Sequence, residues 1–189
     1  MRSFTERLSL CGVSRVFLVS YYYVYQKLNS VCLLLPNFRT QVADNQGVND
    51  TLEFDELCGF VRNKKNKQWL WAALSRKTRQ IVAYVIGDRS EQTFKRLIRK
   101  IPIEYLKCQS YSDYWKSYAI LKAKGNHKQV GKESGQTNHI ERYWATLRAR
   151  ITRYVRKSLS FSRSLRYHHL VTKMFMVDYN QNCLSTLFI

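Results

Sequence analysis

Acidic residues are scarce in this chain, which has 13 Asp and Glu against 32 Lys and Arg among its 189 residues. The net charge is +19 at pH 7, whereas a small domain usually carries a charge of about 2 to 8 in magnitude. Such an excess argues against an ordinary basic surface and indicates a polyanionic partner. Nucleic acid is the first candidate, and an anionic membrane surface is the second.

Cysteine patterns that bind zinc or form disulfide frameworks are missing. The five cysteines are widely spaced and odd in number, and no two of them form a CxxC pair. The four histidines form no HExxH motif. These absences exclude a zinc ribbon or finger and suit a reducing compartment, in which cysteines pack as small apolar side chains. We therefore expect a cytoplasmic protein that is associated with the nucleoid.

Long apolar runs are missing as well. A membrane-spanning helix needs about 20 mostly apolar residues, but the apolar stretch at 13–35 is interrupted by Arg15, Gln26, Lys27 and Asn29. No small-residue cleavage site of a signal peptide follows the N-terminus. We therefore expect no membrane partner. With 45% hydrophobic and 14% aromatic residues, the chain is predicted to bury the core of one catalytic-size domain.

Residues 1–45 form a region of their own, which we predict to be helical. Apolar residues on both sides of Gly12 indicate two short helices with this glycine at the turn. The pattern suits a partial helix-turn-helix whose tyrosines at 21–23 touch phosphates or bases, and equally a plain helical hairpin packed on the main domain. Pro36 ends this region, and the polar stretch 43–50 is predicted to be a linker.

Residues 51–189 form the predicted main domain. Three apolar runs joined by short polar turns, at 51–61, 67–76 and 80–88, predict an antiparallel meander. Ser90 is a good N-cap for a helix that Pro102 ends. The remaining elements are predicted as strand, helix, strand and two helices, at 105–113, 114–124, 126–132, 139–157 and 162–179.

This order of elements defines the predicted fold class. Three strands, a helix, a strand, a helix, a strand and closing helices are the order of a ribonuclease-H-like core, an α/β fold with a mixed sheet. In that order the first and fourth strands are neighbours at the centre of the sheet. Asp55 and Asp113 would then lie side by side, and a C-terminal helix would bring Glu141 to face them.

Three such carboxylates indicate a divalent metal site. Hard oxygen ligands suit Mg²⁺ or Mn²⁺, and a pair of ions about 3.5–4 Å apart can drive an in-line phosphodiester displacement. We therefore predict that Asp55, Asp113 and Glu141 are catalytic and metal-binding residues. The structural alternatives are that each aspartate is a surface residue or turn acceptor at a strand end, and that Glu141 is an ordinary helix ion-pair partner.

Other acids compete for this role. Asp88 follows a glycine and precedes Ser90, which is typical of a turn or a helix cap. Glu133 lies in a glycine-flanked loop and is predicted to be solvated. Glu53 lies two residues before Asp55 and so on the same strand face, where it would be the substitute for Asp55 if that choice were wrong.

The helix that carries Glu141 is strongly basic. Arg148 follows Glu141 by seven residues and lies on the same face, where it would hold a phosphate beside the metal ions. Tyr143 and Trp144 either stack on an exposed base or pack in the core, and core packing is favoured for Trp144. The residues predicted to contact DNA are Arg142, Arg150, Arg153, Arg156 and Lys157, together with Lys64 and Lys65, which are otherwise solubilising charges of a hairpin turn.

Five segments of the chain resemble the DDE transposase of the insertion-element-one family, of the InsB type. They lie between Leu52 and Asn180, a stretch that covers about two thirds of the chain, and they read FDELCGFVRNKKNKQWLWAAL, VIGDRSEQTFKRL, YSDYWKSY, TNHIERYWATLRARITRYVRKSLSFSRS and MFMVDYN. The resemblance implies an Asp–Asp–Glu triad at Asp55, Asp113 and Glu141, with Arg148 as its basic residue. It also implies that 51–189 is the catalytic domain.

The activity implied by the resemblance is DNA cleavage at element ends, followed by joining of a 3′-hydroxyl to target DNA. The implied partners are both kinds of DNA and further copies of the chain. Family members usually carry an N-terminal zinc finger, which this chain lacks. A second reading is therefore a truncated or inactive copy that occupies element ends and represses transposition, and a third is a basic RNA-binding or ribosome-associated protein.

Overall fold

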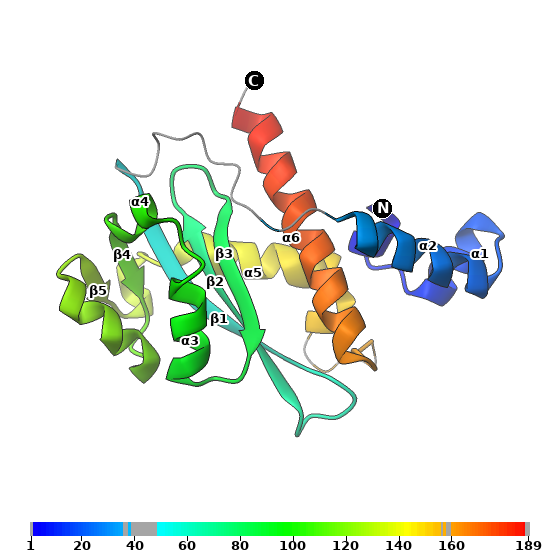
Figure 1. The fold of residues 1–189 in the computed structure, drawn as a ribbon, viewed down its shortest axis with the longest axis horizontal. Coiled ribbons are helices and arrows are strands. Elements are labelled where there is room, and N and C mark those ends of the chain that lie inside the picture. The colour runs from blue at the N-terminus through cyan, green and yellow to red at the C-terminus, as the bar shows by residue number, and fades with distance from the viewer. Residues whose placement is uncertain (1, 36–37, 39–48, 156, 158–159, 188–189) are drawn as a thin grey trace.

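The computed structural model describes all residues except 1, 36–37, 39–48, 156, 158–159 and 188–189. It is a mixed α/β structure built on one five-stranded sheet with the strand order β3-β2-β1-β4-β5 (Figure 1). None of the helices in the described part of the chain is long and apolar enough to cross a membrane. The strands are β1 (Thr51–Phe60), β2 (Lys67–Ser75), β3 (Ile81–Gly87), β4 (Gln109–Ser112) and β5 (His127–Gln129).

The pairing of the strands confirms the predicted meander and the predicted centre of the sheet. β1 pairs with β2, and β2 with β3, in antiparallel fashion. β4 joins the other edge of β1 in parallel, with Thr51 opposite Gln109, and β5 then pairs in parallel with β4. Parallel neighbours end at the same edge of a sheet. The pairing therefore brings the residues that follow β4 close to the middle of β1.

Side chains alternate between the two faces of the sheet and create two cores. On one face Leu57, Leu70 and Ala72 pack against the helices α5 (Asn138–Arg150) and α6 (Leu165–Leu187). On the other face Phe54 and Trp71 pack against α3 (Glu91–Ile98) and the 3-10 helix η3 (Lys116–Lys124). The sheet is therefore the middle layer between two layers of helices.

Elements between β3 and α5 are shorter than predicted. Ser90 caps α3 as expected, since its Oγ accepts from the backbone N of Thr93 at 3.3 Å. The predicted strand 105–113 is wrong in its first half, because Ile103–Leu106 forms the short helix α4 after Pro102. The predicted strand 126–132 is limited to β5, because the chain turns at Gly131 into the 3-10 helix η4 (Lys132–Ser134).

The helix α5 ends at Arg150, not at residue 157 as predicted. Ile151 leaves the helix in an extended conformation, and the 3-10 turn η5 (Thr152–Tyr154) follows. Ile151 and Tyr154 are both buried in the core of this face. The chain thus leaves the helix where burying these two apolar side chains outweighs continued helical hydrogen bonding.

The N-terminal region is helical, as predicted, but its turn is not at Gly12. It consists of η1 (Arg2–Thr5), α1 (Leu10–Phe17) and α2 (Tyr21–Leu34), which lie beside α6 at the edge of the molecule (Figure 1). Gly12 lies inside α1, whose N-cap is Ser9, and the turn falls at Leu18, which has a left-handed φ of 52°. The predicted linker 43–50 lies outside the described residues apart from its last two.

A buried asparagine joins α6 to the edge strand β3. Asn180 accepts from the backbone N of Ile81 and donates to the backbone O of Ile81, both at 2.9 Å. The backbone carbonyl of Asn180 accepts from Gln80 Nε2 at 3.1 Å. The amide therefore satisfies the edge of the strand as a neighbouring strand would, and it explains a polar residue at the end of the MFMVDYN segment.

We expect Asn180→Ala to lower the free energy of unfolding by about 2–4 kcal/mol, because two buried backbone groups of Ile81 lose their partners. Urea unfolding followed by circular dichroism measures the change. Gln181→Ala, at an exposed neighbouring position, serves as the control and should change stability by less than about 0.5 kcal/mol. Equal stability of the two variants would show that the contact contributes nothing.

Candidate active site

A cleft of about 450 Å³ lies where β1, the start of α5 and the loops after β3 and β4 meet. It brings together the four residues predicted to be catalytic, Asp55, Asp113, Glu141 and Arg148. A larger cavity of about 760 Å³ runs along β3, but no acid lies among the described residues that line it. The distribution of carboxylates, and not cavity size, therefore singles out the smaller cleft as the candidate site.

Asp55 is half-buried in the middle of β1 and is held at both carboxylate oxygens. Trp144 Nε1 donates to Oδ2 at 2.9 Å, and the backbone N of Glu56 donates to Oδ1 at 2.8 Å. Burial nevertheless raises the pKa of Asp55 to about 7, assisted by the negative charges of Glu56 and Asp113. The site thus contains a carboxyl group that gains its charge near neutral pH, and a nearby cation would favour the charged form.

Asp113 comes directly after β4, the strand that pairs with β1. Its Oδ1 accepts from the backbone N of Trp115 at 2.9 Å, which closes a tight turn after the strand. Its backbone carbonyl accepts from Gln129 Nε2 at 3.1 Å, which ties the turn to β5. The parallel pairing predicted from the order of elements therefore places Asp113 in the same cleft as Asp55.

Glu141 enters the cleft from the first turn of α5, and Arg148 from two turns further along. Glu141 is exposed, and its Oε1 accepts from Thr137 Oγ1 at 3.5 Å. Within the described residues, no group of three or more His, Cys, Asp and Glu side chains is arranged closely enough to hold a metal ion. Asp55, Asp113 and Glu141 therefore share one cleft without forming a closed cluster.

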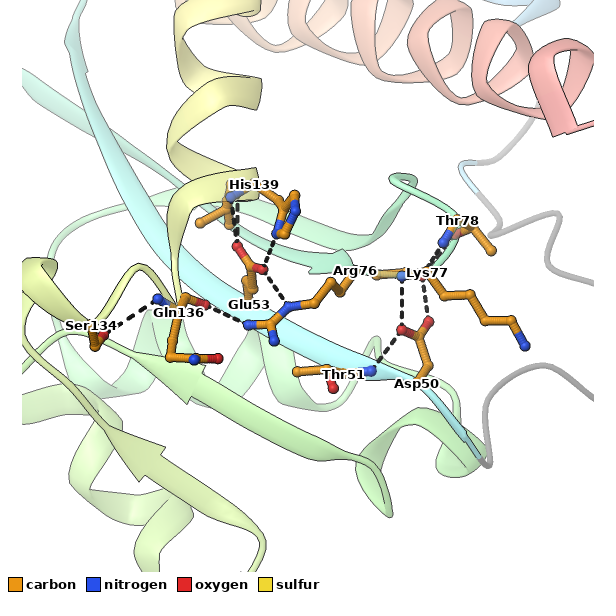
Figure 2. A network of polar contacts seen from close by, with 11 residues as sticks. Asp50, Thr51, Glu53, Arg76, Lys77, Thr78, Ser134, Gln136 and His139 are labelled. Carbon is orange, nitrogen blue, oxygen red and sulfur yellow. Dashed lines mark hydrogen bonds and ion pairs between the residues drawn. The ribbon is translucent and has the colours of Figure 1, made fainter.

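Glu53 shares the strand face of Asp55, but it holds the start of α5 (Figure 2). It is completely buried and accepts from the backbone N of His139 and of Ile140, each at 3.0 Å. Arg76 Nε and His139 Nδ1 donate to its other oxygen at 2.8 and 2.6 Å. A carboxylate at a helix N-terminus is favoured by the helix dipole. Glu53 thus anchors the helix that carries Glu141, a role that the sequence alone did not reveal.

The rival acids have the structural roles predicted for them. Asp88 Oδ1 accepts from Ser90 Oγ at 2.6 Å and from Thr93 Oγ1 at 2.5 Å. These hydrogen bonds lower the pKa of Asp88, so it is a turn and cap residue at the start of α3. Glu133 is exposed in its loop. Neither residue lines the candidate site.

The residues predicted to contact DNA fall into two groups. Arg142 on α5, Lys157, and Lys64 and Lys65 in the turn between β1 and β2 are exposed. Arg150 is instead part of the fold, since it pairs with Glu6 and with Asp178, the latter at 2.7 Å.

Arg153 also differs from the prediction. It is half-buried beyond the end of α5 and donates to Ser162 Oγ at 3.4 Å. Burial lowers the pKa of its guanidinium. Arg156 lies outside the described residues. The prediction of one helical stripe of arginines is therefore wrong past Arg150, because the helix ends there.

Tyr143 and Trp144 are core residues, so base stacking by them is ruled out in this arrangement. They are 1% and 3% exposed, and they contact each other with ring centroids 5.0 Å apart. Tyr143 Oη donates to Met176 Sδ on α6. Trp144 also holds Asp55, and this contact had no signal in the sequence beyond the position of the indole on the apolar face of the helix.

Comparison with known proteins identifies relatives of this chain. A family model described as IS1 transposase matches residues 50–181. The insertion element iso-IS1n protein InsB of Shigella dysenteriae is 37% identical over 124 residues, which are 66% of this chain and 92% of that protein. The IS1 4 protein InsB of Escherichia coli K12 is 36% identical over 120 residues, 63% of this chain and 69% of that protein.

A further relative, the IS1 protein InsB of Shigella flexneri, is 35% identical over 119 residues, 63% of this chain and 88% of that protein. The family match spans well over half of the chain, so this chain is of the class of the transposases of insertion elements. More particularly, the chain belongs to the IS1 transposase family, as the resemblance in its sequence indicated.

We expect Asp55→Asn to stabilise the protein at neutral pH by up to about 4 kcal/mol, since the pKa of Asp55 is raised by about three units and each unit corresponds to about 1.4 kcal/mol. The pKa of Asp55 is about 7 in the fold against an ordinary 3.8, so between these values only the folded chain holds the proton. The stability of the native protein therefore falls, relative to the variant, as pH rises from about 4 to about 7.

Urea unfolding of both proteins at several pH values between 4.5 and 8.5 (about one unit apart) measures this difference. Above about pH 7 the difference should become constant. Glu133→Gln, at an exposed loop position, is the control and should show no such trend. A stability difference for Asp55→Asn that did not change with pH would contradict the assigned environment.

Proposed function

We propose that this protein is a metal-dependent DNA transposase that cleaves at insertion-element ends and transfers a 3′-hydroxyl strand into target DNA. The observation that carries the proposal is that Asp55, Asp113, Glu141 and Arg148 come from three separate elements and line one cleft. Membership of the IS1 transposase family and the net charge of +19 support it.

The topology supports a ribonuclease-H-like core for this domain. The strand order β3-β2-β1-β4-β5, with an antiparallel meander on one side and two parallel strands on the other, matches the order expected from the sequence. Helices cover both faces of the sheet. In this arrangement the two aspartates lie on and after the paired central strands, where such a core would place its catalytic acids.

The carboxylate oxygens of the cleft are ligands of the kind that Mg²⁺ and Mn²⁺ prefer. Asp113 lies near enough for its charge to raise the pKa of Asp55, and a bound cation would relieve that repulsion. Asp55 and Asp113 would hold the metal, with Glu141 as a third oxygen ligand. When bound, a divalent ion polarises the phosphodiester and activates the attacking hydroxyl.

The residues of the chain would then act on the DNA itself. The Arg148 guanidinium, half-buried in the cleft, would hold a phosphate by paired hydrogen bonds. The exposed cations Lys64, Lys65, Arg142 and Lys157 would contact the phosphate backbone further away. We also propose action as a homo-oligomer on paired ends, and a cytoplasmic, nucleoid-associated location, by analogy with the class.

A copy that binds element ends without cutting them is the second candidate. It is favoured by one observation, which is that the described residues hold no closed three-acid group. The family match also begins at residue 50, so the N-terminal helices lie outside it.

The decisive test is nicking of supercoiled plasmid by the purified chain with Mg²⁺, Mn²⁺ or EDTA. We expect nicking only with a metal, and a loss of at least about 100-fold in Asp55→Asn and Asp113→Asn, since even indirect disturbance of metal ligands costs 10–100-fold. Glu133→Gln should keep full activity. Nicking that survives both aspartate changes would place the chemistry elsewhere, and DNA binding without nicking would favour the second candidate.

Arg148 is expected to act on one phosphate only. Arg148→Ala should reduce strand joining by about tenfold or more, since loss of a charged hydrogen bond costs about 1.5–3 kcal/mol. Overall DNA affinity, set by many cations, should fall by about twofold or less. Joining assays with short duplexes and gel-shift titrations measure the two effects. Arg142→Ala, on the exposed side of the same helix, is the control and should weaken DNA affinity more than strand joining. Equal losses of joining and of affinity in Arg148→Ala would contradict the role assigned to Arg148.

A further inference from the structure

Arg89 is a charged residue of the cleft that the proposed chemistry does not use. It lies in the loop between β3 and α3, within the VIGDRSEQTFKRL segment, and its side chain lines the cleft with Asp55 and Asp113. Its guanidinium carbon lies 3.6 Å from the ring centroid of Trp115 and 4.4 Å from that of Trp69. Arg89 is therefore held between two indoles at the edge of the candidate site.

The charge of Arg89 is neutralised by Glu56, the residue after Asp55. Arg89 Nε and Nη2 donate to Glu56 Oε1 at 2.8 and 2.5 Å. Tyr118 Oη donates to the other oxygen, Oε2, at 2.5 Å. The Glu56 side chain is only 1% exposed, so this ion pair is buried on the carboxylate side. Burying a carboxylate is costly without such partners.

The second contact of Arg89 reaches the loop of the other aspartate. Trp115 lies two residues after Asp113, and its backbone N donates to Asp113 Oδ1. Its backbone carbonyl accepts from Gln129 Nε2 at 3.2 Å, so the backbone of Trp115 is tied to the end of β5. One guanidinium thus contacts the immediate neighbourhood of both aspartates, Glu56 on β1 and Trp115 after β4.

We propose that Arg89 is a positioning residue, which fixes the spacing between the strand carrying Asp55 and the loop carrying Asp113. This inference rests on the proposed function, because the spacing matters only if the two carboxylates bind a metal ion together. Mg²⁺ demands near-ideal octahedral geometry and oxygen distances of about 2.0–2.1 Å. A loop that shifts by a fraction of an ångström therefore weakens Mg²⁺ binding.

The shape of arginine is essential to this role. A planar guanidinium stacks on aromatic rings with its faces and donates hydrogen bonds from its edge at the same time. A lysine ammonium at this position keeps the charge but cannot fill the space between two indoles while reaching Glu56. We therefore expect Arg89→Lys to behave like Arg89→Gln, and not like the native protein.

The test compares Arg89→Gln and Arg89→Lys with the native chain in the plasmid assay. We expect the Mg²⁺ concentration for half-maximal nicking to rise about tenfold or more, which corresponds to at least about 1.4 kcal/mol of metal binding. The Mg²⁺ concentration that raises the melting temperature should increase by the same factor, which measures metal binding without activity.

A double variant separates positioning from charge. Arg89→Gln with Glu56→Gln replaces the ion pair by two amides, which protects the fold and removes the extra charge. Its Mg²⁺ requirement should stay raised, because the contacts of the guanidinium with the two indoles are still missing. Arg99→Gln, an exposed cation near the end of α3, controls for the loss of one charge.

The outcomes distinguish this inference from the function on which it rests. Native-like Mg²⁺ dependence of nicking and of thermal stability in Arg89→Gln, beside an active native chain, would overturn the positioning role alone. A native chain that neither nicks DNA nor gains thermal stability from Mg²⁺ would overturn the inference together with the proposed function. Full rescue by Arg89→Lys would reduce the role to charge and would also overturn it.

Discussion

The geometry of the candidate site depends on the contact between the buried carboxylate of Glu53 and the start of α5 (Figure 2). This carboxylate accepts from two backbone N–H groups in the first turn of α5 and from Arg76, so it fixes the start of that helix to the central strand. The same helix carries Glu141, Arg148 and the indole that holds Asp55. Moving this anchor would displace all of them relative to β1, because a helix moves as a rigid body.

Around this anchor the site concentrates negative charge in a very basic protein. Burial and the neighbouring acids keep Asp55 close to the midpoint of its ionisation at neutral pH. Glu56, beside it, is neutralised by Arg89 and Tyr118. Two adjacent acids on one strand therefore have different roles, because alternate side chains of a strand face different surroundings. Asp55 lines the candidate site beside Trp144, and Glu56 holds the surrounding loops.

Much of the fold follows from local patterns. The three strands of the meander, the Ser90 cap and the central pairing of β1 with β4 were predicted from apolar periodicity and from the order of elements. The errors fall where local signals compete with packing. The turn assigned to Gly12 and the end of α5 were misplaced, because a serine cap fixes the start of α1 and burial of Ile151 and Tyr154 ends α5.

Residue type and local spacing were enough to predict the charge, most of the elements, the family resemblance and the choice of Asp55, Asp113, Glu141 and Arg148. The packing of the fold was needed to show which acids line the cleft and which hold the elements around it. Glu53 and Glu56 are ordinary acids in the sequence, and their partners His139 and Arg89 lie far along the chain. Contacts of this kind are set by how β1 packs against α5 and the loop before α3, and no local pattern encodes them.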